Sequence, residues 1–521
     1  MKPESYKLNR NTLLLGLGVI TFISFFAGLG SGPLFDVDEG AFSEATREML
    51  VSKNYLTTYL NGLPRFDKPI LIYWLQLLSV STFGISEFAF RLPSALAAAI
   101  WAMTTYLFVR RERNESEALL ATALLVLSLQ VSIIAKAAIA DALLNCCLAI
   151  SLLAIFRYWR DKRRSSVYIA FTAIGLGVLT KGPIAILIPV AVSLPFFLLQ
   201  GELKAWFRAV LNPTAIALFL TIVLPWYTLE YMDQGQAFIE GFFMKHNISR
   251  FSGSMEGHSG SLFYYLPVIL IGVMPSTGLL LTAIARFRSR LADPLYQFCL
   301  IWFGFVFAFF SLSGTKLPHY MIYGYTPLFI ILGYELARSE RPWLHALWPA
   351  GLLLILAAVP PVLARVIPTM ASLFVRTQLQ GLLDQMAAGH FSILMVAASI
   401  LCMLIQAVPV MAPSLRFLLG GALLTFSFNF IAMPMAARVM QEPVREAAAI
   451  ARKGGLKIVM WQVYYPSFLV YSEALAERRR PEPGEVMLTN IDHIDDFGQC
   501  ERLYGKYGII LAKVPDQQAP R

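Results

Sequence analysis

Long apolar stretches, separated by short polar segments, run through most of this chain. A helix needs about 20 apolar residues to cross the hydrocarbon core of a membrane, and thirteen stretches approach that length. They lie at 11–30, 89–109, 118–135, 142–156, 167–180, 182–199, 209–229, 262–285, 295–313, 318–337, 346–364, 391–410 and 417–436. The pattern therefore predicts an all-α polytopic membrane protein with about thirteen transmembrane helices.

The segments that follow the even-numbered stretches all carry lysine or arginine. Examples are Arg110 and Arg111 after the second stretch, and Arg286 and Arg288 after the eighth. Basic residues favour the cytoplasmic side of a membrane protein. They predict a cytoplasmic N-terminus, and thirteen crossings then place the C-terminus outside.

The first predicted outer loop, residues 31–88, is long enough to hold structure of its own. Glu44, Arg47 and Glu48 have the i, i+3 and i+4 spacing of one helix face. This spacing predicts an amphipathic helix along the membrane surface. A second amphipathic segment is expected near 69–82, after a turn that contains two prolines.

The composition changes after Ala437. Short β-rich runs appear between polar breaks, namely K-I-V-M-W-Q-V-Y-Y, E-V-M-L-T-N and G-I-I-L-A-K-V. Such runs are typical of strands. We therefore expect a transmembrane domain over 1–437 and a small outer α/β or α+β domain over 438–521.

Composition supports a membrane protein and excludes several other classes. Of the 521 residues, 57% are hydrophobic and only 15% are charged, against roughly 25% charged in soluble domains. The mean hydropathy is +0.60. A soluble enzyme, a disordered chain and a nucleic-acid-binding module all fit poorly. The net charge of +10 reflects the basic cytoplasmic segments, so we expect no nucleic-acid partner.

Ionisable residues gather at five of the predicted outer junctions. A single lysine or arginine at a helix end can simply extend its charge to the interface, but charges at membrane depth are costly and usually mark a site. Cations at one face suit an anionic lipid headgroup such as a phosphate, and nearby carboxylates suit acid–base chemistry or a metal. Chemistry alone predicts an outer-face site for a phosphate-bearing lipid and does not name a reaction.

These junctions resemble those of the lipid A aminoarabinose transferases and related GT-C glycosyltransferases, membrane enzymes that use polyprenyl-phosphate-linked sugars. The matching segments are D-E-G-A-F-S-E-A-T-R-E-M-L, F-D-K-P-I-L-I-Y-W, L-T-K-G-P, F-F-M-K-H-N-I-S-R-F and T-K-L-P-H-Y. Their order and spacing resemble the family over about residues 10–440. The family's small periplasmic C-terminal domain also fits in position.

The resemblance implies a role for particular residues. Asp38 and Asp141 would be the two acidic catalytic residues, with Asp38 near the sugar and the acceptor. Lys68 and Arg250 would hold the phosphate of the carrier. The other residues implied to bind substrate or carrier phosphate are Lys181, Lys316, Glu39, His319 and Tyr320.

Two positions depart from the family pattern. Ala41 stands where the aminoarabinose transferases usually have arginine, and Asp67 stands where they have glutamate. Because Ala41 replaces an arginine that would bind a phosphate, the identity of the sugar donor or of the acceptor stays open. The family also has a metal near this acidic turn. Asp67, His246 and His258 are ligand types for zinc, although their spacing is not a metal motif and the histidines could equally make ordinary hydrogen bonds.

The resemblance implies an inverting glycosyltransferase in the bacterial inner membrane, with its active site on the periplasmic face. It would move a sugar, 4-amino-4-deoxy-arabinose or a related amino sugar, from a polyprenyl-phosphate carrier to lipid A or another envelope glycolipid. A monomer surrounded by membrane lipids is expected.

Two other functions stay open from the sequence. A transporter or flippase should carry its charges near the middle of broken helices, whereas here they lie at outer junctions. A protein O-mannosyltransferase shares the GT-C plan, but the F-D-K-P, K-G-P and T-K-L-P-H-Y segments favour the lipid A branch.

Overall fold

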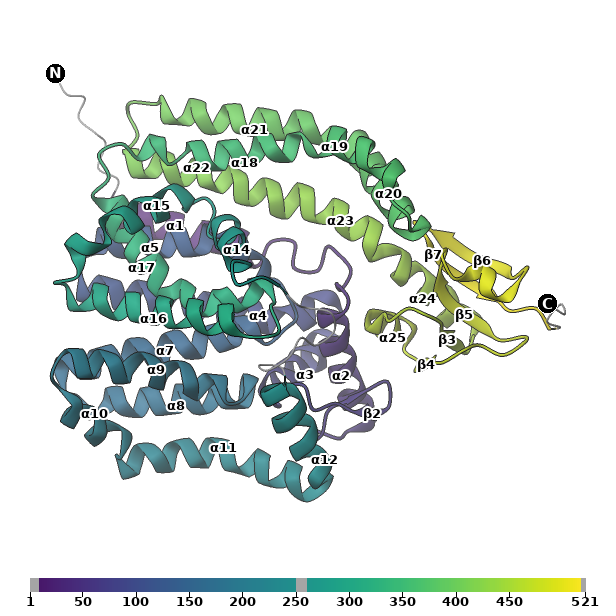
Figure 1. Ribbon diagram of the computed structural model, residues 1–521, viewed down its shortest axis with the longest axis horizontal. Helices are drawn as coiled ribbons and strands as arrows, with labels where there is room; N and C mark the ends of the chain where they lie inside the picture. Colours follow the sequence, from purple (N-terminus) through teal and green to yellow (C-terminus); the bar gives the residue numbers. More distant parts are fainter. Residues whose placement is uncertain (1–8, 250–259, 517–521) are drawn as a thin grey trace.

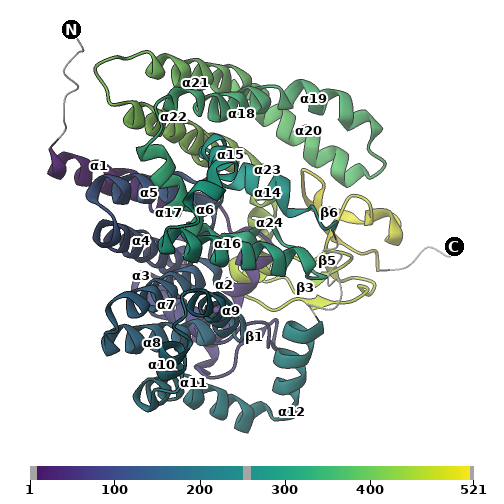
Figure 2. The same cartoon turned by 60° about the vertical axis from the view of Figure 1, so that its left-hand side comes forward.

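The computed structural model describes residues 9–249 and 260–516, with the side chains of 246–249 excepted. Most long helices lie side by side, with their axes roughly parallel to one another (Figure 1). A small β-sheet lies at one end of this bundle, and α1 (Arg10–Phe25) begins at the other end. The turned view in Figure 2 shows the helices surrounding one another as a bundle.

Within the described residues, six helical segments are long and apolar enough to cross a membrane. Four of them are single helices: α4 (Glu87–Glu112), α7 (Asp141–Asp161), α11 (Pro213–Gln234) and α16 (Pro294–Leu312). The fifth, Pro342–Thr369, contains α18 (Leu347–Ala357) and α19 (Val359–Val366). The sixth, Pro413–Met440, contains α22 (Pro413–Ser427) and α23 (Met433–Met440). The chain is therefore a multi-pass membrane protein.

Three bent helix pairs raise that number to nine if each pair is one crossing. They are α5 (Glu115–Leu127) with α6 (Leu129–Ala135), α14 (Tyr265–Gly272) with Thr277–Arg290, which contains α15 (Thr277–Arg286), and α20 (Leu373–Ala388) with α21 (Phe391–Gln406). Helices also occupy the other predicted stretches, as α1, α8 (Arg164–Lys181), α9 (Ile184–Leu199) and α17 (Tyr325–Ala337). Several of these are short, so the expected thirteen crossings stay a prediction.

The break between α5 and α6 shows how an interrupted helix is stabilised inside the bundle. Ser128 lies at the break, and its hydroxyl donates to the carbonyl of Gly272 at 2.8 Å. The backbone N–H of Leu129 donates to the carbonyl of Met274 at 3.0 Å. Non-helical backbone at membrane depth is tolerated where protein groups satisfy it, and α14 and its C-terminal turn provide that here.

The first loop folds into α2 (Asp38–Ser52), the hairpin strands β1 (Tyr59–Leu60) and β2 (Leu63–Pro64), and α3 (Leu71–Phe83). The two expected helices are present. The position of α2 along the membrane surface stays a prediction, but two of the residues expected on its polar face are buried in the protein. Glu44 and Arg47 form an ion pair with two contacts of 2.7 Å, at 0% and 6% exposure.

The C-terminal segment contains α24 (Glu442–Gly454), α25 (Pro466–Ser472) and a five-stranded sheet. The strand order is β4-β3-β5-β7-β6, with bounds Glu477–Arg478, Ile458–Met460, Val486–Asn490, Ile509–Lys513 and Glu501–Lys506. The pairs β3–β4 and β3–β5 are parallel, and the pairs β5–β7 and β6–β7 are antiparallel. Three of these strands fall in the runs that the sequence predicted. Helix α23 continues past the expected domain boundary at 437.

Candidate functional site

Asp141 is the centre of a buried polar cluster at the sheet end of the bundle. It is the first residue of α7, and its side chain is only 5% exposed. Its Oδ1 accepts hydrogen bonds from Lys181 Nζ at 2.7 Å and from the Tyr323 hydroxyl at 2.6 Å. The N-terminus of a helix favours a negative charge, so α7 and Lys181 together stabilise the carboxylate.

Lys181 reaches this carboxylate because α8 ends there. Gly182 follows with a φ of +77°, and Pro183 then starts the turn into α9. A residue with positive φ is a common helix terminator. The L-T-K-G-P segment thus places a lysine at a helix C-terminus, where a cation is also favoured.

A short 3-10 helix, Pro318–Gly324, supplies the third side of the cluster. His319 Nε2 lies 3.9 Å from Asp141 Oδ1. The Lys181 ammonium lies 5.5 Å from the ring centre of Tyr320 and 5.4 Å from that of Tyr323, which is cation–π range. The Tyr323 hydroxyl also accepts from Lys181 at 2.6 Å.

The first loop brings two more predicted residues close to this cluster. Asp38 begins α2 and is exposed. Lys68 Nζ donates to the backbone carbonyl of Asp67 at 3.0 Å. Asp38, Lys68, Asp141 and Lys181 all lie within electrostatic range of His319. Direct contacts therefore gather four predicted residues, Asp141, Lys181, His319 and Tyr320, from three segments, and Asp38 shares a cavity with His319.

Two predicted residues make internal contacts instead. Glu39 accepts from Arg91 Nε and Nη2 at 2.9 and 2.8 Å, from the Ala138 N–H at 2.7 Å and from the Phe35 N–H at 2.9 Å. Lys316 Nζ donates to the carbonyls of Ser311 and Ser313, near the end of α16, at 2.8 and 2.7 Å. Both side chains stabilise the backbone that frames the cluster.

Asp38 and His319 open onto a cavity of about 720 Å³ between the first loop, the end of α6 and residues 429–445. The charged residues of α6, α23 and α24 that line it are Lys136, Arg438, Glu442 and Arg445. Lys136 Nζ lies 4.5 Å from the ring centre of Phe430. Burial and the neighbouring Arg91 lower the pKa of Lys136 to about 8. Carboxylates such as Asp38 and Glu442 also line the cavity, and its cations are suited to bind an anionic group of an amphipathic ligand.

Two of the three predicted metal ligands, and the predicted phosphate-binding residue Arg250, are not described or are described without their side chains. Arg250 and His258, and the side chain of His246, lie outside the described residues. Asp67 Oδ2 pairs with Arg65 Nη2 at 3.0 Å. Among the side chains that the structure describes, no three of His, Cys, Asp or Glu are gathered as metal ligands. The described residues alone do not fit a metal, and the zinc site stays a prediction.

Four residues of this site were not predicted from the sequence. Tyr323 lies three residues after Tyr320, so the 3-10 helix directs both side chains at Lys181. The aromatic spacing in H-Y-M-I-Y was the sequence signal that could have predicted Tyr323. Arg91, Arg438 and Arg445 reach the site only through the packing of distant helices. No local pattern distinguishes them from other basic residues.

Comparisons with known proteins agree with this architecture. A family model described as dolichyl-phosphate-mannose-protein mannosyltransferase matches residues 67–228. An uncharacterized protein of Aquifex aeolicus is 30% identical over 343 residues, which are 66% of this chain and 78% of that protein. An undecaprenyl phosphate-alpha-4-amino-4-deoxy-L-arabinose arabinosyl transferase of Yersinia enterocolitica is 31% identical, over 61% of this chain and 59% of that enzyme.

The crystal structure of ArnT from Cupriavidus metallidurans bound to undecaprenyl phosphate shares the fold. The TM-score is 0.79 at 19% identity, and the match covers 98% of this chain and 99% of that one. The match to the Yersinia transferase spans about three fifths of that enzyme's length.

The helical bundle, the helical first loop and the C-terminal sheet have the fold of the GT-C membrane glycosyltransferases. Within that class, the chain belongs to the ArnT-like family, together with the aminoarabinose transferases and the Aquifex protein.

Proposed function

We propose that the chain transfers an amino sugar from a polyprenyl-phosphate carrier to lipid A or another envelope glycolipid. The observation that carries this proposal is the contact of Lys181, Tyr323 and His319 with one buried carboxylate, Asp141, and the cavity of about 720 Å³ that His319 shares with Asp38. Three cationic or polar donors next to an exposed carboxylate suit the departure of a phosphate and the activation of an acceptor.

The chemistry is a single displacement at the anomeric carbon. An acceptor oxygen forms a bond to that carbon while the bond to the carrier's phosphate oxygen breaks, and the electron pair leaves with the polyprenyl phosphate. Lys68, Lys181 and His319 stabilise the charge that develops on the phosphate. One displacement inverts the configuration of the sugar.

Asp38 takes the acceptor's proton if the acceptor is a hydroxyl group. It begins α2 and is exposed at the cavity, so a substrate group can reach it. If the acceptor is already a phosphate, no base is needed and Asp38 orients the amino group of the sugar. Asp141 instead positions Lys181 and Tyr323, which both bond to its Oδ1.

The acceptor would lie along the wall formed by α6, α23 and α24. Lys136, Arg438 and Arg445 line that part of the cavity, and they would bind the acceptor's phosphate. In this proposal the cavity faces the periplasm, the protein lies in the inner membrane with its N-terminus in the cytoplasm, and a single chain forms the complete site.

The test is a transfer assay with purified protein in liposomes that contain undecaprenyl-phosphate aminoarabinose and lipid A, with products measured by mass spectrometry. Asp38→Asn should lower transfer about 100-fold or more, the usual contribution of acid–base catalysis. Asp384→Asn, on an exposed face of α20, is the matched control and should remain active.

Two results would contradict the proposal. Full activity of folded Asp38→Asn would exclude the catalytic role of this carboxylate. Transfer to a serine- or threonine-containing peptide, with none to lipid A, would favour a protein O-mannosyltransferase-like enzyme.

A further inference from the structure

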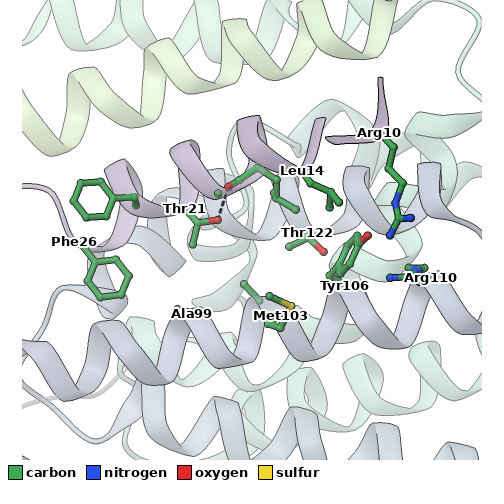
Figure 3. A pocket seen from close by; sticks show the side chains of 13 residues that line it. Arg10, Leu14, Thr21, Phe26, Ala99, Met103, Tyr106, Arg110 and Thr122 are labelled. Atoms are coloured by element: carbon green, nitrogen blue, oxygen red, sulfur yellow. Dashed lines mark hydrogen bonds between the residues drawn. The ribbon is translucent and has the colours of Figure 1, made fainter. Parts of the chain in front are cut away.

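A second groove follows α1 along its length, from Arg10 to Phe26. It runs between α1, α4 and α5 and has a volume of about 500 Å³. Apolar side chains such as Leu14, Leu17 and Met103 form most of its wall (Figure 3). Two arginines, Arg10 and Arg110, lie at one end, and Phe26 lies at the other.

The charged end of the groove carries more positive than negative charge. Arg10 Nε lies 3.5 Å from Glu115 Oε1, and Arg110 Nε lies 3.3 Å from Glu115 Oε2. One glutamate therefore faces two guanidinium groups, which are 55% and 44% exposed. Such partly exposed guanidinium groups are suited to bind a phosphate.

A buried hydroxyl lies next to the charged end. Thr122 lines the groove and is 2% exposed, and its Oγ1 has no hydrogen-bond partner within the described protein. The comparable hydroxyl of Thr21 is satisfied by the Leu17 carbonyl at 2.7 Å. A buried hydroxyl without a partner is costly, and an acceptor bound in the groove would remove that cost at Thr122.

The groove is long enough to hold one phospholipid. Its wall follows α1 from Arg10 to Phe26, and the 16 residues of α1 extend about 24 Å at 1.5 Å per residue. A leaflet with its headgroup region is roughly 20–22 Å thick. A phospholipid carries, in order, a phosphate, ester carbonyls and an acyl chain. The groove presents arginines, then the Thr122 hydroxyl, then apolar side chains in the same order.

We infer that this groove binds one anionic phospholipid of the surrounding membrane. Its phosphate pairs with Arg10 and Arg110, an ester carbonyl accepts from Thr122, and an acyl chain extends toward Phe26. The site is separate from the sugar-transfer site and does not depend on the proposed activity.

Two glycines of α1 provide a matched pair of variants. A Cβ added at Gly16 or at Gly18 would have no heavy atom within 4 Å, so a larger side chain is accommodated at both. Only Gly18 lines the groove. Replacing either by leucine improves helix propensity, but only Gly18→Leu puts a side chain where the lipid would lie.

The experiment is native mass spectrometry of the full chain, delipidated in detergent and titrated with phosphatidylglycerol or phosphatidylcholine. The wild type and Gly16→Leu should each retain one phosphatidylglycerol, and Gly18→Leu should lose it while unfolding at an unchanged or higher temperature. Arg110→Gln should weaken phosphatidylglycerol binding about fivefold. Arg163→Gln, an exposed change outside the groove, should have no effect.

Three outcomes would overturn the inference. Gly18→Leu could bind phosphatidylglycerol as tightly as Gly16→Leu does. Phosphatidylcholine could bind as tightly as phosphatidylglycerol does. The lipid that copurifies with the wild type and is lost in Gly18→Leu could be a polyprenyl phosphate, which would make the groove a second carrier site.

Discussion

Asp36 is a buried carboxyl two residues before the proposed catalytic Asp38. Its Oδ1 accepts from the Ser467 N–H at 2.8 Å, and its Oδ2 accepts from the Ser467 hydroxyl. These bonds favour the ionised form, but burial dominates and raises the pKa of Asp36 from 3.8 to about 7. The carboxyl therefore joins the first loop to α25 and titrates near neutral pH.

This raised pKa predicts a pH dependence of stability. The folded protein holds the Asp36 proton more tightly than the unfolded chain, so the free energy of unfolding should fall as the pH rises from about 4 to about 7. In Asp36→Asn that decrease should be smaller. Unfolding temperatures in detergent across this range would measure it, and an Asp36→Asn profile identical to that of the wild type would contradict the assignment.

At the scale of elements, the Glu39–Arg91 contact positions the start of α2. Arg91 donates to both carboxylate oxygens of Glu39 and also to the carbonyls of Leu29, Gly32 and Pro33, at 2.7 to 3.0 Å. One guanidinium thus ties the loop after α1 to the first turn of α2. Asp38 lies between these fixed points.

Arg91→Lys should therefore impair catalysis even though the charge is kept. An ammonium cannot reproduce the planar five-donor geometry of the guanidinium, so Asp38 would be held less precisely. We expect kcat to fall about tenfold or more with a smaller change in KM, because misplacing a reacting group is costly. Steady-state kinetics would measure both constants, and a rise in KM alone would indicate a role in binding instead.

Helix α2 also shows what the sequence could not decide about an element. The spacing of Glu44, Arg47 and Glu48 is the same whether the polar face meets water or protein. In the structure, α25 and α3 lie against α2, and the Glu44–Arg47 ion pair is enclosed. Local periodicity identifies the helix but cannot identify what covers it.

At the scale of the whole molecule, the two ends of the bundle differ in chemistry. The end where α1 begins also holds the end of α4, with Arg110, Arg111 and Arg113, whereas the other end holds the sheet (Figure 1). Basic residues favour the cytoplasm. The sheet, the cavity and the C-terminus should therefore share the opposite side.

This orientation predicts the result of reporter fusions. A periplasm-active phosphatase fused after Arg521 should be active in cells, and one inserted after Arg113 should be inactive. A cytoplasm-fluorescent reporter at the same two positions is the control and should give the inverse result. Activity at both positions, or at neither, would contradict the orientation and the odd number of crossings.

Much of the site was predictable because its signals are local. The K-G-P turn ends α8 at Lys181, and α7 begins at Asp141 directly after the K-A-A-I-A segment. The F-D-K-P turn contains Lys68. Such helix-end signals act over a few residues. The internal contacts of Glu39 and Lys316 were not predictable, because they depend on which backbone groups neighbouring segments leave without a partner.

By itself, the sequence determined that this chain is a helical membrane protein with cations and carboxylates gathered at one end, since apolar length and charge placement are properties of the chain. Only the tertiary structure decided which of those charges meet. Asp36 and Ser467, 431 residues apart, become bonded partners, and α23 and α24 bring Arg438 and Arg445 to the cavity of Asp38. The physical reason is that burial and pairing depend on distant segments packing together, which no local pattern encodes.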